Sequence, residues 1–417
     1  MNDTTVALEE IYKAELNLKG IINKTPLEFN ERLSNLFDAK IYLKREDLQP
    51  VRSYKIRGAY NKIFSLTQKQ RENGIVAASA GNHAQGVALA CKKMEIKGVI
   101  FMPVTTPSQK ILQVQMHGAY FVEVILIGDT FDEAYAASME YSKEHEMEFV
   151  HPFDDIKIIE GQATVGLEII SQSNENIDIL FAPLGGGGLL SGVSSVFKEL
   201  SPDTKIIAVE PENATSMKEA VENGEPITLT SIDTFVDGAA VKRVGDLTYE
   251  ICKHLVSEYT EVPVGMICTN ILELYNRDGI ITEPAGVMSV SALENYRYEI
   301  KGKTVVCVIS GGNNDITRME DIKEKSLMYE GLKHYFVVTF PQRAGALKEF
   351  LLEVLGDDDD ITFFEYSKKT SRSSGPAVVG IQLKQKEDFE PLVKRMKEKG
   401  FLGEYLNHKP EFFGVLI

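Results

Sequence analysis

Short runs of apolar, mostly β-branched residues alternate along most of the chain with segments in which apolar residues recur every three or four positions. The short runs predict strands, and the periodic segments predict amphipathic helices. Residues 189–200 are typical of the second kind, because Val193, Val196 and Phe197 fall on one helical face. The predicted strands cover residues 40–44, 74–79, 97–102, 121–127, 177–183, 205–210 and 303–310.

This alternation predicts a layered α/β fold. Strands as apolar as these are buried on both faces, as they are in parallel sheets covered by helices. Ligands of such sheets bind beyond the carboxyl ends of the strands. Loops at those ends that carry glycine or polar residues are therefore the first places to look for a functional site.

The pattern changes near residue 330. A polar helix is expected over residues 315–330, followed by a strand (334–340), a helix (347–355), two strands (361–367 and 377–383), a helix (388–400) and a last apolar segment (412–417). This order matches the ferredoxin-like βαββαβ unit. About 85 residues are enough for a small domain that folds on its own.

Composition and charge narrow the class of protein. The 417 residues are 43% hydrophobic and 25% charged, which is ordinary for a globular protein and excludes wholesale disorder. The net charge of −16 repels the phosphate backbone of nucleic acids. No apolar run is long enough to cross a bilayer, and the acidic N-terminus lacks the pattern of a secretory signal. We therefore expect a cytoplasmic protein with neither a nucleic-acid nor a membrane partner.

The four cysteines predict neither disulfides nor a zinc site. Cys91, Cys252, Cys268 and Cys307 lie far apart in the sequence and form no CxxC pair. Cys91 and Cys307 lie in apolar stretches, where a buried, inert thiol is the usual state. We expect a reducing compartment and no metal.

Lys55 is the first candidate for chemistry. It follows the loop QPVRS and opens the helical run RGAYNKIFSL, with apolar neighbours on both sides. Most lysines are solvated surface charges, but a lysine in a desolvated pocket has a lowered pKa and becomes a usable amine nucleophile. Such an amine is what a Schiff base with an aldehyde cofactor requires.

Four consecutive glycines, Gly185 to Gly188, follow a predicted strand and lead through Leu189 into a helix. Glycines expose backbone N–H groups with no Cβ in the way, and a helix N-terminus adds a partial positive charge. We interpret the segment as a phosphate cradle. It is not a P-loop, since no Lys-Ser/Thr follows, and its spacing does not fit GxGxxG. The alternative is a merely tight turn, which rarely needs four glycines.

Two further loops end predicted strands. In SAGNH (79–83), small residues and backbone amides at a helix start could receive a carboxylate. Alternatively, Asn82 only caps the helix, and His83 is more simply a packing or hydrogen-bonding histidine than a catalytic one. In SGGNN (310–314), the hydroxyl of Ser310 could face a ring nitrogen of a cofactor that lies over the strand ends. An ordinary strand-ending turn is the alternative there.

Together these segments resemble the biosynthetic threonine dehydratases, which belong to the fold type II pyridoxal-phosphate enzymes. The order and spacing of six motifs agree with that family from about residue 20 to 325: SYKIRGAYN, SAGNHAQGVA, PLGGGGLLSG, VDGAAV, EPAGVMSVSALENY and VISGGNND. The resemblance implies a tryptophan-synthase-β-like catalytic core over residues 1–325, with a smaller subdomain at roughly 51–155 nested in it. Residues 334–417 resemble the single ACT-like regulatory domain of the family's shorter members.

The resemblance also implies a role for each motif residue. Lys55 would carry the pyridoxal 5′-phosphate and move the α-proton of the substrate. Asn82 would bind the 3′-oxygen of the cofactor, and Ser310 would contact its ring nitrogen. Tyr54 stands where the family usually places phenylalanine against the ring, so its hydroxyl needs a partner if it is buried. The cofactor phosphate would lie on Gly185, Gly186, Gly187, Gly188 and Leu189, and the substrate on Ser79, Ala80, Gly81 and Gly238.

The implied reaction is the deamination of L-threonine to 2-oxobutanoate and ammonia, the first committed step of isoleucine biosynthesis, with L-serine as a weaker substrate. A catabolic serine/threonine dehydratase and a serine racemase are the alternatives. Racemases typically carry serine where this chain has Ala80, and the racemase-like metal site is incomplete, because Ser216 replaces an aspartate near Glu210. Glu283 is expected to begin a helix, and a direct catalytic role for it stays open.

The last domain is expected to be a feedback sensor for isoleucine. Residues 340–347 (FPQRAGAL), between its first strand and first helix, resemble the effector-binding turn of amino-acid-sensing domains. A dimerisation domain without a ligand is the alternative. We expect a homo-oligomer, either a dimer or a tetramer. A non-catalytic amino-acid sensor would have lost the lysine or the phosphate cradle, and both are intact.

Overall fold

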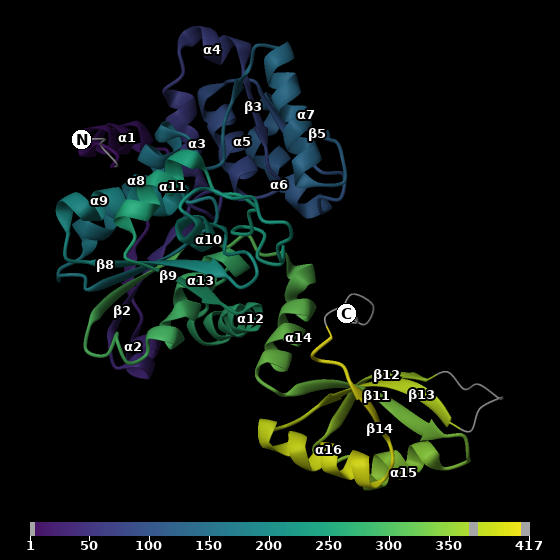
Figure 1. Cartoon of the computed structure of the whole chain (residues 1–417). Helices are drawn as coiled ribbons and strands as arrows, with labels where there is room; N and C mark the ends of the chain where they lie inside the picture. The colour runs from purple at the N-terminus through teal and green to yellow at the C-terminus, as the bar shows by residue number, and fades with distance from the viewer. Residues whose placement is uncertain (1–4, 367–373, 410–417) are drawn as a thin grey trace. The chain divides into compact units, whose positions relative to one another are not determined.

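The chain divides into two compact units, residues 1–315 and 316–417, in a computed structural model that describes residues 5–366 and 374–409. Figure 1 labels the elements of both units. The polar helix expected over residues 315–330 belongs with the second unit, because the division falls between Asp315 and Ile316. That residues 1–325 and 334–417 are autonomous domains, with a nested subdomain at about 51–155, stays a prediction.

The larger sheet of the first unit has six strands within the described ranges, in the order β1-β2-β10-β7-β8-β9. β1 pairs with β2 antiparallel, and every other neighbouring pair is parallel. The side chains of β7 and β10 are buried along their whole length, as predicted for strands covered on both faces. The strands are β1 (Leu27–Phe29), β2 (Lys40–Arg45), β7 (Ile179–Pro183), β8 (Lys205–Pro211), β9 (Glu258–Val262) and β10 (Thr304–Ile309).

The smaller sheet of the same unit has four described strands in the order β5-β4-β3-β6, all of them parallel. Its central strands are buried, whereas the edge strand β5 is half exposed. Figure 1 shows this sheet among α5, α6 and α7. The strands are β3 (Ile75–Ala78), β4 (Gly98–Met102), β5 (Val122–Leu126) and β6 (Glu148–Phe149).

Helices connect and cover the two sheets, which confirms the predicted α/β fold. All seven strands expected in this unit are present, whereas β1, β6 and β9 were missed because β1 and β6 are very short and β9 carries two glutamates. The helices are α1 (Leu8–Leu18), α2 (Glu31–Phe37), α3 (Lys55–Phe64), α4 (Gln68–Asn73), α5 (Asn82–Met94), α6 (Ser108–Gly118), α7 (Phe131–Glu144), α8 (Ile156–Gln172), α9 (Gly188–Leu200), α10 (Ser216–Asn223), α11 (Asp246–Leu255), α12 (Val264–Glu273) and α13 (Pro284–Ser291).

The second unit is a ferredoxin-like sheet with two helices on one face, as predicted. Its described strands run in the order β12-β13-β11-β14, and each neighbouring pair is antiparallel. Phe336, Phe350 and Phe401 lie in the core between the sheet and its helices, which Figure 1 shows as α15 and α16. The elements are α14 (Met319–Tyr329), β11 (Lys333–Pro341), α15 (Ala346–Glu353), β12 (Asp360–Tyr366), β13 (Ser374–Gln382), α16 (Phe389–Glu398) and β14 (Leu402–Tyr405).

The last strand of that sheet is β14, which the sequence analysis did not anticipate. The strand has only four residues, and they are too polar to give a strand signal in the sequence. They pair with β11, and Gly403 allows a close approach, since a Cβ there would lie 2.5 Å from the carbonyl oxygen of Val337. The apolar segment 412–417, which was expected in this place, lies outside the described residues.

All four cysteines are buried and none is in a disulfide, so the burial predicted for Cys91 and Cys307 is confirmed. Burial raises the pKa of Cys91 to about 12. None of the helices in the described parts of the chain has the length and apolar character needed to cross a membrane.

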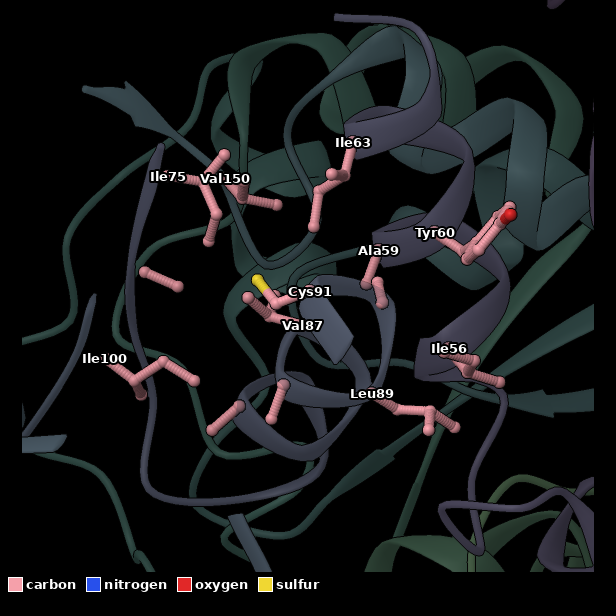
Figure 2. Close-up of a cluster of buried hydrophobic side chains, with 14 of the residues drawn as sticks. Ile56, Ala59, Tyr60, Ile63, Ile75, Val87, Leu89, Cys91, Ile100 and Val150 are labelled. Atoms are coloured by element: carbon pink, nitrogen blue, oxygen red, sulfur yellow. The ribbon is translucent and has the colours of Figure 1, made fainter. Parts of the chain in front are cut away.

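Helix α3 packs between α5 and α8 at unusually short range. A Cβ on Gly58 would lie 2.8 Å from the carbonyl oxygen of Ile158, and one on Gly161 would lie 2.4 Å from that of Arg57. On the other side, a Cβ on Gly86 of α5 would meet the backbone of Lys55 at 3.1 Å. Figure 2 shows side chains of α3 and α5 gathered in the core of the smaller sheet. Glycines therefore let three helices contact one another through their backbones.

A buried ionic cluster fixes α3 to the larger sheet. The Arg57 guanidinium donates to both carboxylate oxygens of Glu46, at 2.7 and 2.8 Å, and to both of Glu168, at 2.8 and 2.9 Å. Lys44 of β2 adds a third contact, from its Nζ atom to Glu168 at 2.6 Å. Arg57 and Glu46 are fully buried, and Glu168 is 6% exposed. The cluster joins α3 to the end of β2 and to α8.

Burial alone would raise the pKa of the Glu46 carboxyl group, but the charges of Arg57 and Lys44 hold it below its usual range. Glu46 therefore stays ionised while it is paired. A partner removed from such a cluster leaves a buried charge with nothing to offset it.

Arg57→Met is expected to lower the free energy of unfolding by about 3–5 kcal/mol, because it strands the carboxylates of Glu46 and Glu168 in the interior. Urea unfolding followed by circular dichroism measures the change. The control is Arg277→Met, which removes an exposed ion pair with Glu273 and should cost less than about 1 kcal/mol. Equal losses in the two variants would show that the buried cluster contributes no more than a surface pair.

Candidate active site

Lys55 is the first residue of α3, and the backbone just before it is tied to the end of β10. Ser53 forms an isolated β-bridge with Gly311. The amide of Tyr54 donates to the carbonyl oxygen of Ser310 over 3.2 Å. The residues that the sequence analysis assigned to the Schiff base, the cofactor ring and the ring nitrogen are thus neighbours in the structure.

The amine of Lys55 is suited to act as a nucleophile. Its Nζ atom donates to the carbonyl oxygen of Pro152 at 2.9 Å and lies 5.4 Å from the ring centre of Tyr54. Burial lowers the pKa of Lys55 to about 8, although the charge of Glu283 acts in the opposite direction. A substantial fraction of this amine is therefore neutral near physiological pH.

Glu283 lies beside Asn82, although 201 positions separate them in the sequence. The Nδ2 atom of Asn82 donates to Oε1 of Glu283 at 2.5 Å. Glu283 is the N-cap of α13 and Pro284 opens the helix, as predicted. Burial raises the pKa of the Glu283 carboxyl group to about 7, and the charge of Asp237 adds to the rise. The group can therefore exchange a proton near neutral pH.

Asn82 does not serve as a helix cap. The N-cap of α5 is Gly81, and Asn82 is the first helical residue, with its side chain turned away to α13. The alternative interpretation of Asn82 as a mere cap is therefore wrong. Asn313 completes this group, because its Nδ2 atom donates to Oδ1 of Asn82 at 2.6 Å.

The glycine loop presents a row of free amides. None of the described residues accepts a hydrogen bond from the backbone N–H groups of Gly185 to Leu189, and the first bond of α9 runs from Ser191 to Gly187. Gly187 has φ +94°, a conformation that favours glycine. Free amides at the start of a thirteen-residue helix are suited to bind an anion.

The loop is packed so tightly from behind that side chains are excluded. A Cβ on Gly186 would lie 2.2 Å from the ring of Phe153, and one on Gly187 would lie 2.8 Å from Cβ of Thr248. Thr248 also donates from Oγ1 to the carbonyl oxygen of Gly186 at 2.7 Å. Because Pro152 accepts from Lys55, the adjacent residues Pro152 and Phe153 join the lysine to the glycine loop. A merely tight turn would not need this packing.

The remaining predicted site residues lie at the ends of neighbouring elements. Ser310 follows β10, and its hydroxyl donates to the carbonyl oxygen of Ala285 over 3.3 Å. Residues 79–81 form the turn between β3 and α5, where the amide of Gly81 donates to Oγ of Ser79. A Cβ on Gly238 would lie 3.8 Å from Oε1 of Glu283. The roles of these residues towards cofactor and substrate stay predictions.

Tyr54 packs with its ring partly buried against the core of the larger sheet. Burial and the charge of Glu283 raise the pKa of its phenol, so the hydroxyl is neutral. The histidine after Asn82 has a structural role, as expected: His83 is buried and its Nε2 atom is bonded to the carbonyl oxygen of Val150 at 2.9 Å. Burial lowers the pKa of His83 to about 3, so it is uncharged.

Glu210 lies near the end of β8 and is used to cap a helix. Its carboxylate accepts from the amides of Met217 and Lys218, at 2.8 and 2.9 Å, at the start of α10. Burial raises the pKa of Glu210 to about 7. This capping accounts for the residue without any bound ion.

Asn313 and Phe153 were not predicted from the sequence, and a direct catalytic role for Glu283 was left open. The only signal for Glu283 was an acidic residue directly before Pro284, which is also typical of any helix start. Asn313 was visible as part of the SGGNN turn, but nothing in the sequence distinguishes it from its neighbour Asn314. Glu283 and Asn313 both bond to Asn82 at the start of α5, which is more than 200 positions away from either of them in the sequence.

Comparison with known proteins decides the family. The pyridoxal-phosphate dependent enzyme family matches residues 18–311, and the C-terminal regulatory domain of threonine dehydratase matches residues 324–416. The chain is 53% identical over 412 residues to the biosynthetic L-threonine dehydratase of Halalkalibacterium halodurans, covering 99% of both chains. It is 52% identical over 415 residues to that of Bacillus subtilis, covering 100% of this chain and 98% of the relative.

The chain belongs to the biosynthetic L-threonine dehydratase family. Solved structures agree with this assignment. The processed form of threonine deaminase isoform 2 from Solanum lycopersicum has a TM-score of 0.72 and 37% identity, covering 78% of this chain and 95% of that one. Maize serine racemase, at 29% identity, has the same TM-score of 0.72 and covers 78% of this chain and 99% of that chain.

The dehydratase family depends on pyridoxal phosphate, and the residues present fit that group. The cofactor needs an amine for its aldehyde and an anion site for its phosphate. Lys55 offers a half-buried amine whose pKa is lowered. The loop from Gly185 to Leu189 offers free amides, and its packing against Phe153 and Thr248 leaves no room for side chains.

Uptake of pyridoxal phosphate by the cofactor-free protein should become faster as pH rises towards about 8, the pKa of Lys55, because only the neutral amine attacks an aldehyde. Above the Glu283 pKa of about 7 its carboxylate is ionised and raises the pKa of Lys55. Glu283→Gln should therefore move the midpoint of the rate profile to lower pH. The rate is followed as growth of the visible absorbance of the bound cofactor.

The matched control for this profile is Glu294→Gln, which removes an exposed carboxylate paired with Arg297 and should leave the midpoint unchanged. A midpoint near the ordinary lysine value, about 10.4, would contradict the burial of the amine.

Proposed function

We propose that this chain deaminates L-threonine to 2-oxobutanoate and ammonia, with pyridoxal phosphate bound through Lys55. The observation that carries the proposal is that Pro152 and Phe153 connect a half-buried amine to a cradle of free amides. Identity to biosynthetic L-threonine dehydratases over nearly the whole chain supports threonine as the substrate.

In the proposed arrangement the amides from Gly185 to Leu189 would hold the cofactor phosphate, and Lys55 would bind its aldehyde. Asn82 would donate to the 3′-oxygen, Ser310 would contact the ring nitrogen and Tyr54 would pack against the ring. When bound, the cofactor supplies an electron sink for the α-carbon of the substrate. A serine hydroxyl is too weak an acid to keep the ring nitrogen protonated, which limits that sink and favours loss of the β-hydroxyl over transamination.

Substrate binding is assigned to the turn before α5. Residues Ser79, Ala80 and Gly81 directly precede the N-terminus of α5, whose partial positive charge favours a carboxylate there. Lys55 takes the α-proton of threonine at its Nζ atom. Ala80 offers no hydroxyl that could return a proton on the opposite face, so elimination is favoured over racemisation. Gly238 leaves room beside Glu283 for the substrate.

Lys55→Ala is expected to lower threonine turnover by at least about a hundredfold, because it removes both the cofactor link and the group that moves the α-proton. Release of 2-oxobutanoate measures turnover, and circular dichroism checks the fold. The control Lys69→Ala removes an exposed lysine on α4 and should keep full activity. A Lys55→Ala protein with a tenth of the original turnover would exclude Lys55 from both roles.

The second unit is proposed to bind isoleucine as a feedback inhibitor. A cavity of about 560 Å³ lies between β12 and α15, and it includes the segment 340–347 that resembles an effector turn. Gly345 has φ +86° and leaves the backbone open at the start of α15. The apolar lining of Leu347, Leu351 and Phe364 suits a branched aliphatic side chain. A cytoplasmic homo-oligomer, dimeric or tetrameric, is proposed as the working form.

Leu351→Asp should abolish inhibition by isoleucine and leave threonine turnover intact, because it puts a charge into the apolar cavity but not into the first unit. Turnover is measured against isoleucine concentration. Leu16→Asp, at an exposed position on α1, is the control and should stay inhibited. Unchanged inhibition of the Leu351→Asp protein, or none in the original protein, would contradict the proposal.

A further inference from the structure

Asn313 occupies a position from which it controls another amide. Its Nδ2 atom donates two hydrogen bonds, one to the carbonyl oxygen of Val51 at 2.8 Å and one to Oδ1 of Asn82 at 2.6 Å. Both N–H bonds of the Asn313 amide are thereby used. Val51 is fully buried, so no solvent competes for its carbonyl.

The Val51 carbonyl sets the direction of every bond in this chain of contacts. A carbonyl oxygen only accepts, so Asn313 must turn its NH₂ group, and not its oxygen, towards Val51. The same NH₂ group also faces Asn82, which must therefore accept the hydrogen bond through its Oδ1 atom. A reversed Asn313 would set two acceptors against each other in the interior, which is unfavourable.

The direction continues through Asn82 to Glu283. With Oδ1 held by Asn313, the NH₂ group of Asn82 points the other way and donates one hydrogen to Oε1 of Glu283. Glu283 accepts this bond in either protonation state, because a protonated carboxyl group keeps one acceptor oxygen. One N–H of Asn82 remains unassigned, and it belongs to the end of the amide that faces away from Asn313.

We infer that Asn313 and Glu283 are positioning residues that together hold the Asn82 amide with its NH₂ group towards the 3′-oxygen of the cofactor. The inference rests on the proposed contact between Asn82 and that oxygen. Without the two residues, the amide could present its oxygen there instead, and an acceptor would face the negatively charged 3′-oxygen. The relay of Val51, Asn313, Asn82 and Glu283 thus presents a hydrogen-bond donor to the charged 3′-oxygen of the cofactor.

The charged groups around the relay do not reverse it. Lys55 at the start of α3, Asp237 in the loop before α11 and Lys110 on α6 act on Glu283 through their charges, and Tyr54 is neutral. The bond between Asn313 and Asn82 joins two uncharged amides. The direction of that bond follows from Val51 and is therefore independent of pH in the original protein.

Two substitutions of Asn313 separate orientation from packing. Asn313→Asp keeps the shape but replaces the donor NH₂ by an acceptor, so it should reverse Asn82. Asn313→Ala removes more atoms but leaves the Asn82 amide free to adopt either orientation. We expect the aspartate variant to lose more of the visible absorbance of the bound cofactor and to weaken cofactor binding on the order of tenfold, with a smaller effect for alanine.

The effect of Asn313→Asp should also shrink as pH falls, because a protonated carboxyl group regains one donor. Absorbance spectra across pH and the dissociation constant of the cofactor are the readouts, and the unfolding temperature of the cofactor-free protein checks the fold. Asn295→Asp, which removes an exposed amide that donates to the carbonyl oxygen of Glu261, is the control and should change neither readout. An alanine effect equal to or larger than the aspartate effect would overturn the relay.

Glu283 provides a second test that does not depend on the folding of the Asn313 variants. Glu283→Gln and Glu283→Met remove the same charge, but only glutamine keeps an acceptor for Asn82. The relay requires more visible absorbance in the glutamine variant, and equal spectra would contradict it. Asn82→Ala distinguishes the proposed 3′-oxygen contact from the relay that orients Asn82. An unchanged spectrum of this variant rejects the contact and, with it, the relay. A changed spectrum beside an unaffected Asn313→Asp rejects the relay alone.

Discussion

The pairing of Arg57 with Glu46 and Glu168 is the constraint on which the first unit depends. The three charges lie in the interior, where water cannot replace a lost partner. A shift of α3 relative to β2 or α8 would break bonds to a fully buried guanidinium, and such a break is costly. Because Lys55 lies two residues before Arg57 on the same helix, the cluster also sets the position of the amine.

The candidate site is assembled from the ends of helices. Lys55 opens α3, Asn82 opens α5, Gly188 opens α9 and Glu283 caps α13. Helix N-termini carry partial positive charge and free N–H groups, which favour bound anions and a neutral lysine. The phosphate of the cofactor and the carboxylate of the substrate are anionic, so one physical feature accounts for two parts of the proposed site.

The second unit has a hydrophobic core of its own, to which aromatic side chains contribute. Its cavity faces α15 and the edge strand β12, and most of the apolar lining is partly exposed. Regulation through such a site requires that the effector bind one state of the protein better than another, with a typical coupling of about 1–3 kcal/mol. Substitutions in this cavity therefore test the proposed effector binding without changing a residue of the first unit.

The sequence by itself determined the α/β architecture and the first five elements of the βαββαβ order of the second unit, and it predicted Lys55 and the glycine loop as parts of the site. Each of these features depends on contiguous residues: the strand and helix periodicities, four glycines in a row, and one lysine at a helix start. Tertiary structure alone decided that Asn82 meets Glu283 and Asn313, that Arg57 is buried between two glutamates, and that Phe153 closes the glycine loop. A polar residue at a loop or helix end has several possible partners in the sequence. Which one it bonds to depends on which ends the packed core brings together, and burial then makes that one partner obligatory.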